Sequence, residues 1–219
     1  MARMARVVVP HCPHHVTQRG NRKQKTFFYE SDYREYMRFL VEAKNSSGVE
    51  IWAYCLMPNH IHIVAVPEHR DSLSEFFGCA HRRYTRMVNT REGWQGHLWQ
   101  ERFHSFAMDE HYLYEAVKYV ELNPVRAKLC HRPDLWMWSS VHAHLNGRDD
   151  ELVNVKPMLK RVGDWCNYLK TGSSEQAMIN IQNHSRTGRP LGDNRFVRAL
   201  ERVTGRRLQR GQPGPKSGK

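Results

Sequence analysis

Along the first 130 residues, apolar positions alternate between a period of two, typical of strands, and a helical period near four. The two-residue pattern predicts four strands, over residues 6–19, 49–56, 60–66 and 98–108. The helical pattern predicts three helices, over residues 31–45, 71–89 and 110–122. Ser31 is the expected N-cap of the first helix, and Asn123-Pro124 ends the third, because a residue before proline disfavours the helical region.

The order of these elements, β-α-β-β-α-β-α, predicts an α+β fold. It is the split βαβ order of a ferredoxin-like (RRM-like) antiparallel sheet with helices on one side, followed by one extra helix. Beyond Pro133 the pattern changes to short helical segments, which predict a mostly helical C-terminal extension. We therefore expect three regions: a first domain over 1–132, a helical extension over 133–205, and a basic disordered tail over 206–219.

Charge narrows the class of partner. The chain of 219 residues has 34 Lys and Arg against 22 Asp and Glu, a formal net charge of +12, which is typical of a protein that binds polyanions. The apolar runs are too short for a membrane span, and the N-terminus lacks the features of a signal peptide. Five widely spaced cysteines without a CxxC pair indicate reduced thiols, so we expect a cytoplasmic protein that does not bind membranes.

Two histidines flank one isoleucine in the segment MPNHIHIV, residues 57–64. On a strand, His60 and His62 point to the same face and Ile61 to the other, which is the geometry for two ligands of one divalent cation. A second pair, His142 and His144, lies in a segment without strand alternation and is expected to be structural or to lie at the surface. The cluster at residues 11–15 has no second ligand pair at metal-site spacing, so we expect a structural role there too.

The helix YLYEAVKYVELNP supplies a possible third ligand and a nucleophile. Tyr119 and Asn123 are four residues apart and share one helix face. An amide oxygen suits Mg²⁺ or Mn²⁺ better than zinc, and a tyrosine beside such a cation can attack a phosphodiester. The alternative is that Tyr119 and Tyr112, seven apart, are core aromatics of an amphipathic helix.

Several motifs occur together in one order: VTQRGNRKQKTFF, AYCLMPNHIHIV, LWQERFHSF, YVELNPVRAKL, WSS and TGRPLGD. With them the chain resembles the REP-associated tyrosine transposases, within the HUH single-tyrosine transposases that include insertion-sequence enzymes. The resemblance implies that His60, His62 and Asn123 bind a divalent cation, Mg²⁺ or Mn²⁺, and that Tyr119 is the nucleophile. Insertion-sequence relatives have glutamine where this chain has Asn123.

The resemblance also implies the substrate: single-stranded DNA hairpins of repetitive extragenic palindromes (REP), flanked by a guide tetranucleotide. Cleavage would leave a 5′-phosphotyrosine and a free 3′-OH, and the reverse attack would rejoin strands. It implies a bacterial, nucleoid-associated protein. We expect a monomer acting in cis, with a homodimer as the alternative, because the REP-associated branch is compatible with a monomer and no clear dimer strand is present.

Basic and aromatic residues fit such a substrate. Basic side chains suit phosphates and aromatic rings suit unpaired bases. The candidates for DNA binding are Arg19, Arg22, Lys23, Lys25, Arg82, Arg83, Arg86, Trp99, Arg102 and Phe103. Each charge has solvated surface as its alternative, and each aromatic ring has the core.

Two other functions stay open at this point. A hairpin-binding protein with a vestigial site would keep the basic surface and form no covalent product. A replication initiator or relaxase would use the same chemistry, but such proteins usually carry helicase domains for which 219 residues leave no room.

Overall fold

The computed structural model describes residues 5–209, which fold around a four-stranded antiparallel sheet. The strands are β1 (His14–Arg19), β2 (Val49–Met57), β3 (His60–Pro67) and β4 (His104–Ala107). They lie in the order β2-β3-β1-β4, with α1 (Glu30–Ser47) connecting β1 to β2 and α2 (Ser72–Glu92) connecting β3 to β4. This is the predicted ferredoxin-like arrangement.

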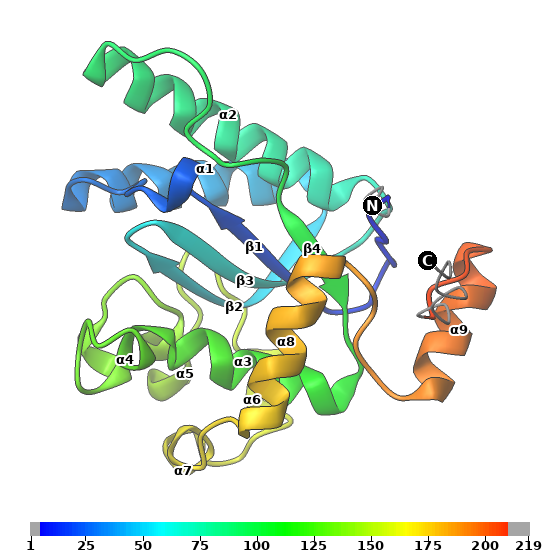
Figure 1. The fold of residues 1–219 in the computed structure, drawn as a ribbon. Coiled ribbons are helices and arrows are strands. Elements are labelled where there is room, and N and C mark those ends of the chain that lie inside the picture. Colours follow the sequence, from blue (N-terminus) through cyan, green and yellow to red (C-terminus); the bar gives the residue numbers. More distant parts are fainter. Residues whose placement is uncertain (1–4, 210–219) are drawn as a thin grey trace, which may run out of the picture.

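Helices cover both faces of the sheet (Figure 1). The sequence predicted helices on one side only. That side is the face to which Ile61 and Ile63 point, and α1 and α2 pack on it as predicted. The other face is covered by α3 (Glu110–Glu121) and α8 (Glu175–Thr187). The two histidines of β3 lie on this second face, with Val64.

Three element boundaries differ from the prediction. The first strand begins at His14 and not at Arg6, because Val7 and Val9 pack in a separate cluster with Leu200 and Leu208. The first helix has Tyr29 as its N-cap in place of Ser31. The Asp32 carboxylate accepts the amide protons of Phe28 and Tyr29, which fixes that start. The fourth strand is only four residues long.

The remaining described elements are short, apart from α8 and α9. They are the 3₁₀ turns η1 (Asn21–Lys23) and η2 (Pro133–Leu135), and the helices α4 (Asn123–Arg126), α5 (Val141–Asn146), α6 (Lys156–Leu159), α7 (Trp165–Lys170) and α9 (Asn194–Thr204). The third helix ends near the predicted position, and α4 begins directly after it at Asn123, with Pro124 in its first turn. Among residues 5–209, none of the helices has the length and apolar character needed to cross a membrane.

A buried carboxylate ties the helical extension to α3. Glu121, fully buried, accepts hydrogen bonds from Ser140 Oγ (2.6 Å), His144 Nδ1 (2.6 Å) and Trp165 Nε1 (2.9 Å). His144 therefore has a structural contact, as expected. Near the C-terminal end of the described residues, the Arg206 guanidinium donates hydrogen bonds to the carbonyl oxygens of residues 5 and 6. Residues 210–219 of the predicted tail lie outside the described residues.

Candidate active site

The two histidines of β3 stand side by side on the face covered by α3. Their ring centroids are 5.0 Å apart. Strand alternation places them there, and pairing with β1 sets Thr17 opposite His62 and Arg19 opposite His60. The structure thus brings the two predicted ligands together.

The turn before His60 is held by its neighbours. Asn59 Oδ1 lies 2.6 Å from His60 Nδ1, and Asn59 Nδ2 donates to the Lys23 carbonyl at 2.8 Å. The Gly20 amide donates to the Asn59 carbonyl at 2.8 Å. With Nδ1 of His60 engaged by an amide oxygen, its Nε2 is the nitrogen left for a metal.

His62 has a corresponding partner on the neighbouring strand. His15 Nε2 lies 3.1 Å from His62 Nδ1, and the two rings stack with centroids 5.2 Å apart. The Nδ1 atoms of His60 and His62 therefore both have hydrogen-bond partners. The Nε2 atoms of His60 and His62 are the pair available for one cation.

Burial keeps these imidazoles neutral at pH 7, the form that binds metals. It lowers the pKa of His60 to about 4, with a further contribution from the charge of Arg19. It lowers the pKa of His15 to about 3, with Arg126 adding to the effect. The pKa of His62 is likewise held well below its ordinary value by burial and by the neighbouring rings and guanidinium groups.

Tyr119 lies on α3 directly against this pair. Its ring meets the His62 ring edge to face, with centroids 5.4 Å apart. The guanidinium carbon of Arg126 sits 3.9 Å from the centroid of the Tyr119 ring, and Arg126 Nη2 donates to the Tyr119 carbonyl at 2.6 Å. The cation over the ring fixes the position of the phenol relative to His62.

Asn123 opens α4 one turn beyond Tyr119 and is 8% exposed. Its side-chain amide makes no hydrogen bond to any other residue of the described range 5–209. Within that range no group of three or more His, Cys, Asp and Glu side chains is placed to hold a metal ion. A metal here would take two imidazole nitrogens and one amide oxygen. The two neutral imidazoles lie together, and Asn123 follows Tyr119 by one helical turn with its amide free to bind.

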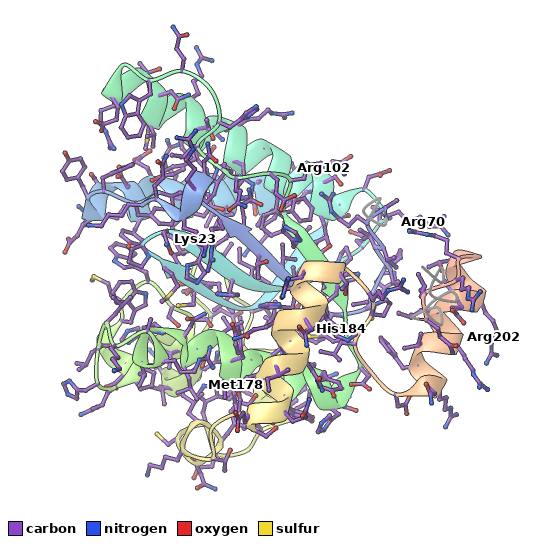
Figure 2. All side chains as sticks on the ribbon, viewed as in Figure 1. Lys23, Arg70, Arg102, Met178, His184 and Arg202 are labelled. Carbon is purple, nitrogen blue, oxygen red and sulfur yellow. The ribbon has the colours of Figure 1, made fainter. Side chains whose placement is uncertain are left out.

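The predicted basic loop borders the site. Arg19, Arg22, Lys23 and Lys25 are all exposed, and Lys23 is labelled in Figure 2 near the β1–β3 end of the sheet. Arg22 and Lys23 adopt left-handed backbone angles, with φ of 52° and 63°. Such angles are rare in residues with a Cβ, so the loop's contacts with the Pro58-Asn59 turn hold it in place.

A second basic surface lies on the other side of the sheet. A groove of about 770 Å³ runs between α2 and residues 97–103, and its lining includes Arg82, Arg86 and Arg102 (Figure 2 labels Arg102). Arg83 does not join them, because it pairs with Glu42 on α1 and lies over the Phe39 ring.

Trp99 and Phe103, the predicted stacking residues, are both largely buried. Trp99 is 7% exposed and packs against Phe27, Tyr36 and His81, and Phe103 is 6% exposed beneath Arg6. Both rings nevertheless line the groove, so their stacking on bases stays a prediction.

Two residues of the site were not singled out from sequence. His15 was grouped with His11, Cys12 and His14, yet strand alternation turns His14 to the opposite face, where it bonds the Cys12 carbonyl. The alternation of a strand is therefore the sequence signal that could have assigned His15, and not His14, to the face of the site. Arg126, within the motif VRA, carries no local signal, because its contact with Tyr119 depends on how α4 folds back.

Comparison with known proteins defines the class. Residues 8–123 match the family model described as "Transposase IS200 like", which is more than half of the 219 residues. The chain therefore belongs to the IS200-like transposase family. No curated protein sequence matches it.

One of two similar solved structures supports the fold. A REP-associated tyrosine transposase bound to a REP hairpin superposes with a TM-score of 0.59 at 20% identity, covering 71% of this chain and 93% of that one. A structure from Deinococcus radiodurans, provisionally named a transposase, has a TM-score of 0.39 at 19% identity over 55% of this chain and 96% of that one, too low to support an argument. The first likeness supports the ferredoxin-like fold.

Proposed function

We propose that this transposase cuts and rejoins single-stranded DNA at hairpin-forming repeats, with Tyr119 as the nucleophile and with His60, His62 and Asn123 as the ligands of a divalent cation. The observation that carries the proposal is the placement of Tyr119 against His62 within one chain. That contact favours attack in cis by a monomer. We also propose that the protein acts in the bacterial cytoplasm, where a transposase meets its DNA.

The chemistry conserves the phosphodiester energy. A bond forms between Tyr119 Oη and phosphorus as the bond from phosphorus to the 3′ oxygen of the preceding nucleotide breaks. The phenol loses its proton and the leaving oxygen gains one, which gives a 5′-phosphotyrosine and a free 3′-OH. Attack of a 3′-OH on the phosphotyrosine restores the strand and frees the tyrosine.

A divalent cation bound at the two Nε2 atoms and the Asn123 oxygen would supply positive charge to the scissile phosphate. Mg²⁺ or Mn²⁺ is the proposed ion, since an amide oxygen is a ligand for hard cations. The chain itself contributes the orientation: Asn59 fixes His60, His15 faces His62, and Arg126 holds the Tyr119 ring.

The basic loop and the groove are proposed to hold phosphates of the hairpin and its flanking strand. The fold-related transposase bound to a REP hairpin supports this class of substrate. Exposed guanidinium and ammonium groups near the turn of β2 and β3 would guide the strand toward the site.

The test uses labelled single-stranded hairpins with REP-type flanks, incubated with wild type and Tyr119→Phe in Mn²⁺ or EDTA. We expect a slower, protein-linked DNA band on a denaturing gel only for wild type with metal. Tyr119→Phe should lose roughly 10³-fold or more of the adduct, on the order of the loss from removing a nucleophile, and keep its DNA binding. Binding without any adduct across several repeat sequences would instead identify a non-catalytic hairpin-binding protein.

A further inference from the structure

Helix α8 belongs to the C-terminal extension, yet it reaches the centre of the site. It contacts α3, β4 and β1, and Figure 1 shows it crossing the sheet beside β4. Ser185 on α8 lies with its Oγ 3.4 Å from His15 Nδ1. Ser185 and His62 therefore contact the two opposite nitrogens of the same imidazole.

The protonation pattern of this chain of groups follows from the metal geometry. A neutral His62 that offers Nε2 to a cation carries its proton on Nδ1. That proton can only be donated to an unprotonated His15 Nε2, at 3.1 Å. His15 then carries its own proton on Nδ1, where the Ser185 hydroxyl is the acceptor.

A second contact from the same helix face reaches the arginine that lies over the Tyr119 ring. Met178 Sδ lies 3.8 Å from Arg126 Nη1, the guanidinium that covers the Tyr119 ring. Met178 and Ser185 are seven residues apart, two helical turns, with the fully buried Ile181 between them. Figure 2 labels Met178 and His184 along this helix. One face of α8 thus supports both halves of the site.

We propose that His15 is a positioning residue that holds His62 in the tautomer with its proton on Nδ1, and that Ser185 of α8 fixes His15 in turn. This inference rests on the proposed metal site at His60 and His62. It makes α8 a structural part of that site. Partners of this kind orient a ligand and raise its basicity, and their loss typically weakens metal binding by about 10- to 100-fold.

The variants separate hydrogen bonding from packing. His15→Leu removes the acceptor and keeps an apolar side chain of similar volume, whereas His15→Gln keeps an amide oxygen that can reach the position of Nε2. Ser185→Ala removes the outer partner. Asn183→Ala, on the exposed side of α8, is the matched control. Circular dichroism and thermal melting establish that each variant is folded.

Two readouts are independent of DNA cleavage. Nitrogen-15 NMR of the metal-free protein reports the tautomer of His62, and titration calorimetry with Mn²⁺ reports its affinity. We expect the Nδ1–H tautomer in wild type, its loss in His15→Leu with about 10- to 100-fold weaker Mn²⁺ binding, and recovery to near wild type in His15→Gln. Ser185→Ala should show mixed tautomers and weaker binding, and Asn183→Ala should match wild type.

An Nε2–H tautomer of His62 in wild type would overturn the inference, as would unchanged Mn²⁺ affinity in folded His15→Leu and Ser185→Ala. Failure of wild type to bind Mn²⁺ is a different result. It would reject the metal site of the proposed function, and the NMR tautomer would still decide whether His15 orients His62.

Discussion

At the scale of single residues, the site depends on which ring nitrogen each histidine presents. Spacing alone predicts that His60 and His62 share a face, and the structure places their ring centroids 5.0 Å apart. Sequence could not identify the partners, because His15 is 47 residues away from His62 and Ser185 is 170 away from His15. Such contacts depend on tertiary packing and leave no local pattern.

His14, the neighbour of His15, predicts a pH effect on stability. His14 is fully buried. Its Nδ1 lies 2.7 Å from the Cys12 carbonyl oxygen, and its Nε2 accepts a hydrogen bond from the Val9 amide. Burial lowers the pKa of His14 to about 4. The unfolded chain, with a histidine pKa of about 6.5, binds more protons below that pH. Stability is therefore full above about pH 6.5 and falls as the pH drops toward about 4.

Thermal melting at about pH 7.5 and about pH 5, on either side of the ordinary histidine pKa, tests this effect. We expect a lower melting temperature at the acidic pH, with the same difference in His97→Gln, since His97 is exposed. His14→Gln should show a smaller difference between the two pH values. A wild-type melting temperature equal at both would contradict the assignment.

At the scale of elements, the period of the apolar positions was sufficient to predict the strands of the sheet and the helices that connect them. It failed where long-range contacts determine the residue at which an element begins. Val7 and Val9 have strand-like sequence but pack against α9 and Leu208. The start of α1 is set by the Asp32 carboxylate and not by the hydroxyl of Ser31.

The loop after β1 shows how an element positions the site. A Cβ at Gly20 would overlap the Gln24 carbonyl oxygen and lie 2.7 Å from Thr26 Cγ2. Gly20→Ala therefore has to displace this loop from the Asn59 carbonyl. We expect a loss of about 2 kcal/mol in the free energy of unfolding, within the range for overpacking, and weaker Mn²⁺ binding by calorimetry.

Gly78→Ala is the control for that substitution. Gly78 lies within α2, and a Cβ added there would meet no other atom within 4 Å, so alanine should be neutral or stabilise by up to about 1 kcal/mol. Equal denaturant midpoints for Gly20→Ala and wild type would show that the loop can accept the methyl group.

At the scale of the whole molecule, one buried carboxylate joins the extension to the helix that carries Tyr119. Glu121 has three donors from α5, α7 and the residue before α5. Glu121→Ala leaves them unpaired and should lower the free energy of unfolding by about 3–5 kcal/mol, as for a broken buried pair. Urea denaturation measures it.

The matched control is Glu110→Ala, at the start of the same helix, where an exposed carboxylate pairs with Arg161. It should cost at most about 1 kcal/mol. A similar small loss for Glu121→Ala would mean that water replaces its contacts and that the extension is held by apolar packing alone.

The basic groove makes a prediction about salt. If Arg82 and Arg86 each neutralise one phosphate, the double substitution to alanine should reduce the slope of log K against log salt by about 1.5. Arg83→Ala, on the same helix but paired with Glu42, should change the slope far less. Fluorescence anisotropy of a labelled hairpin, measured from about 50 to about 200 mM salt, gives this slope for each variant. Equal slopes for the wild type and the double variant would show that the groove does not bind phosphates.

The contact between His15 and Ser185 joins the start of the described chain to its C-terminal extension, which affects when the site forms during translation. The first strand, the histidine pair and Tyr119 all leave the ribosome before α8 does. During translation the nascent chain thus holds the proposed ligands and nucleophile without the helix whose Ser185 contacts His15. Under the proposed function, the site is therefore completed late in synthesis, when α8 packs against α3, β4 and β1.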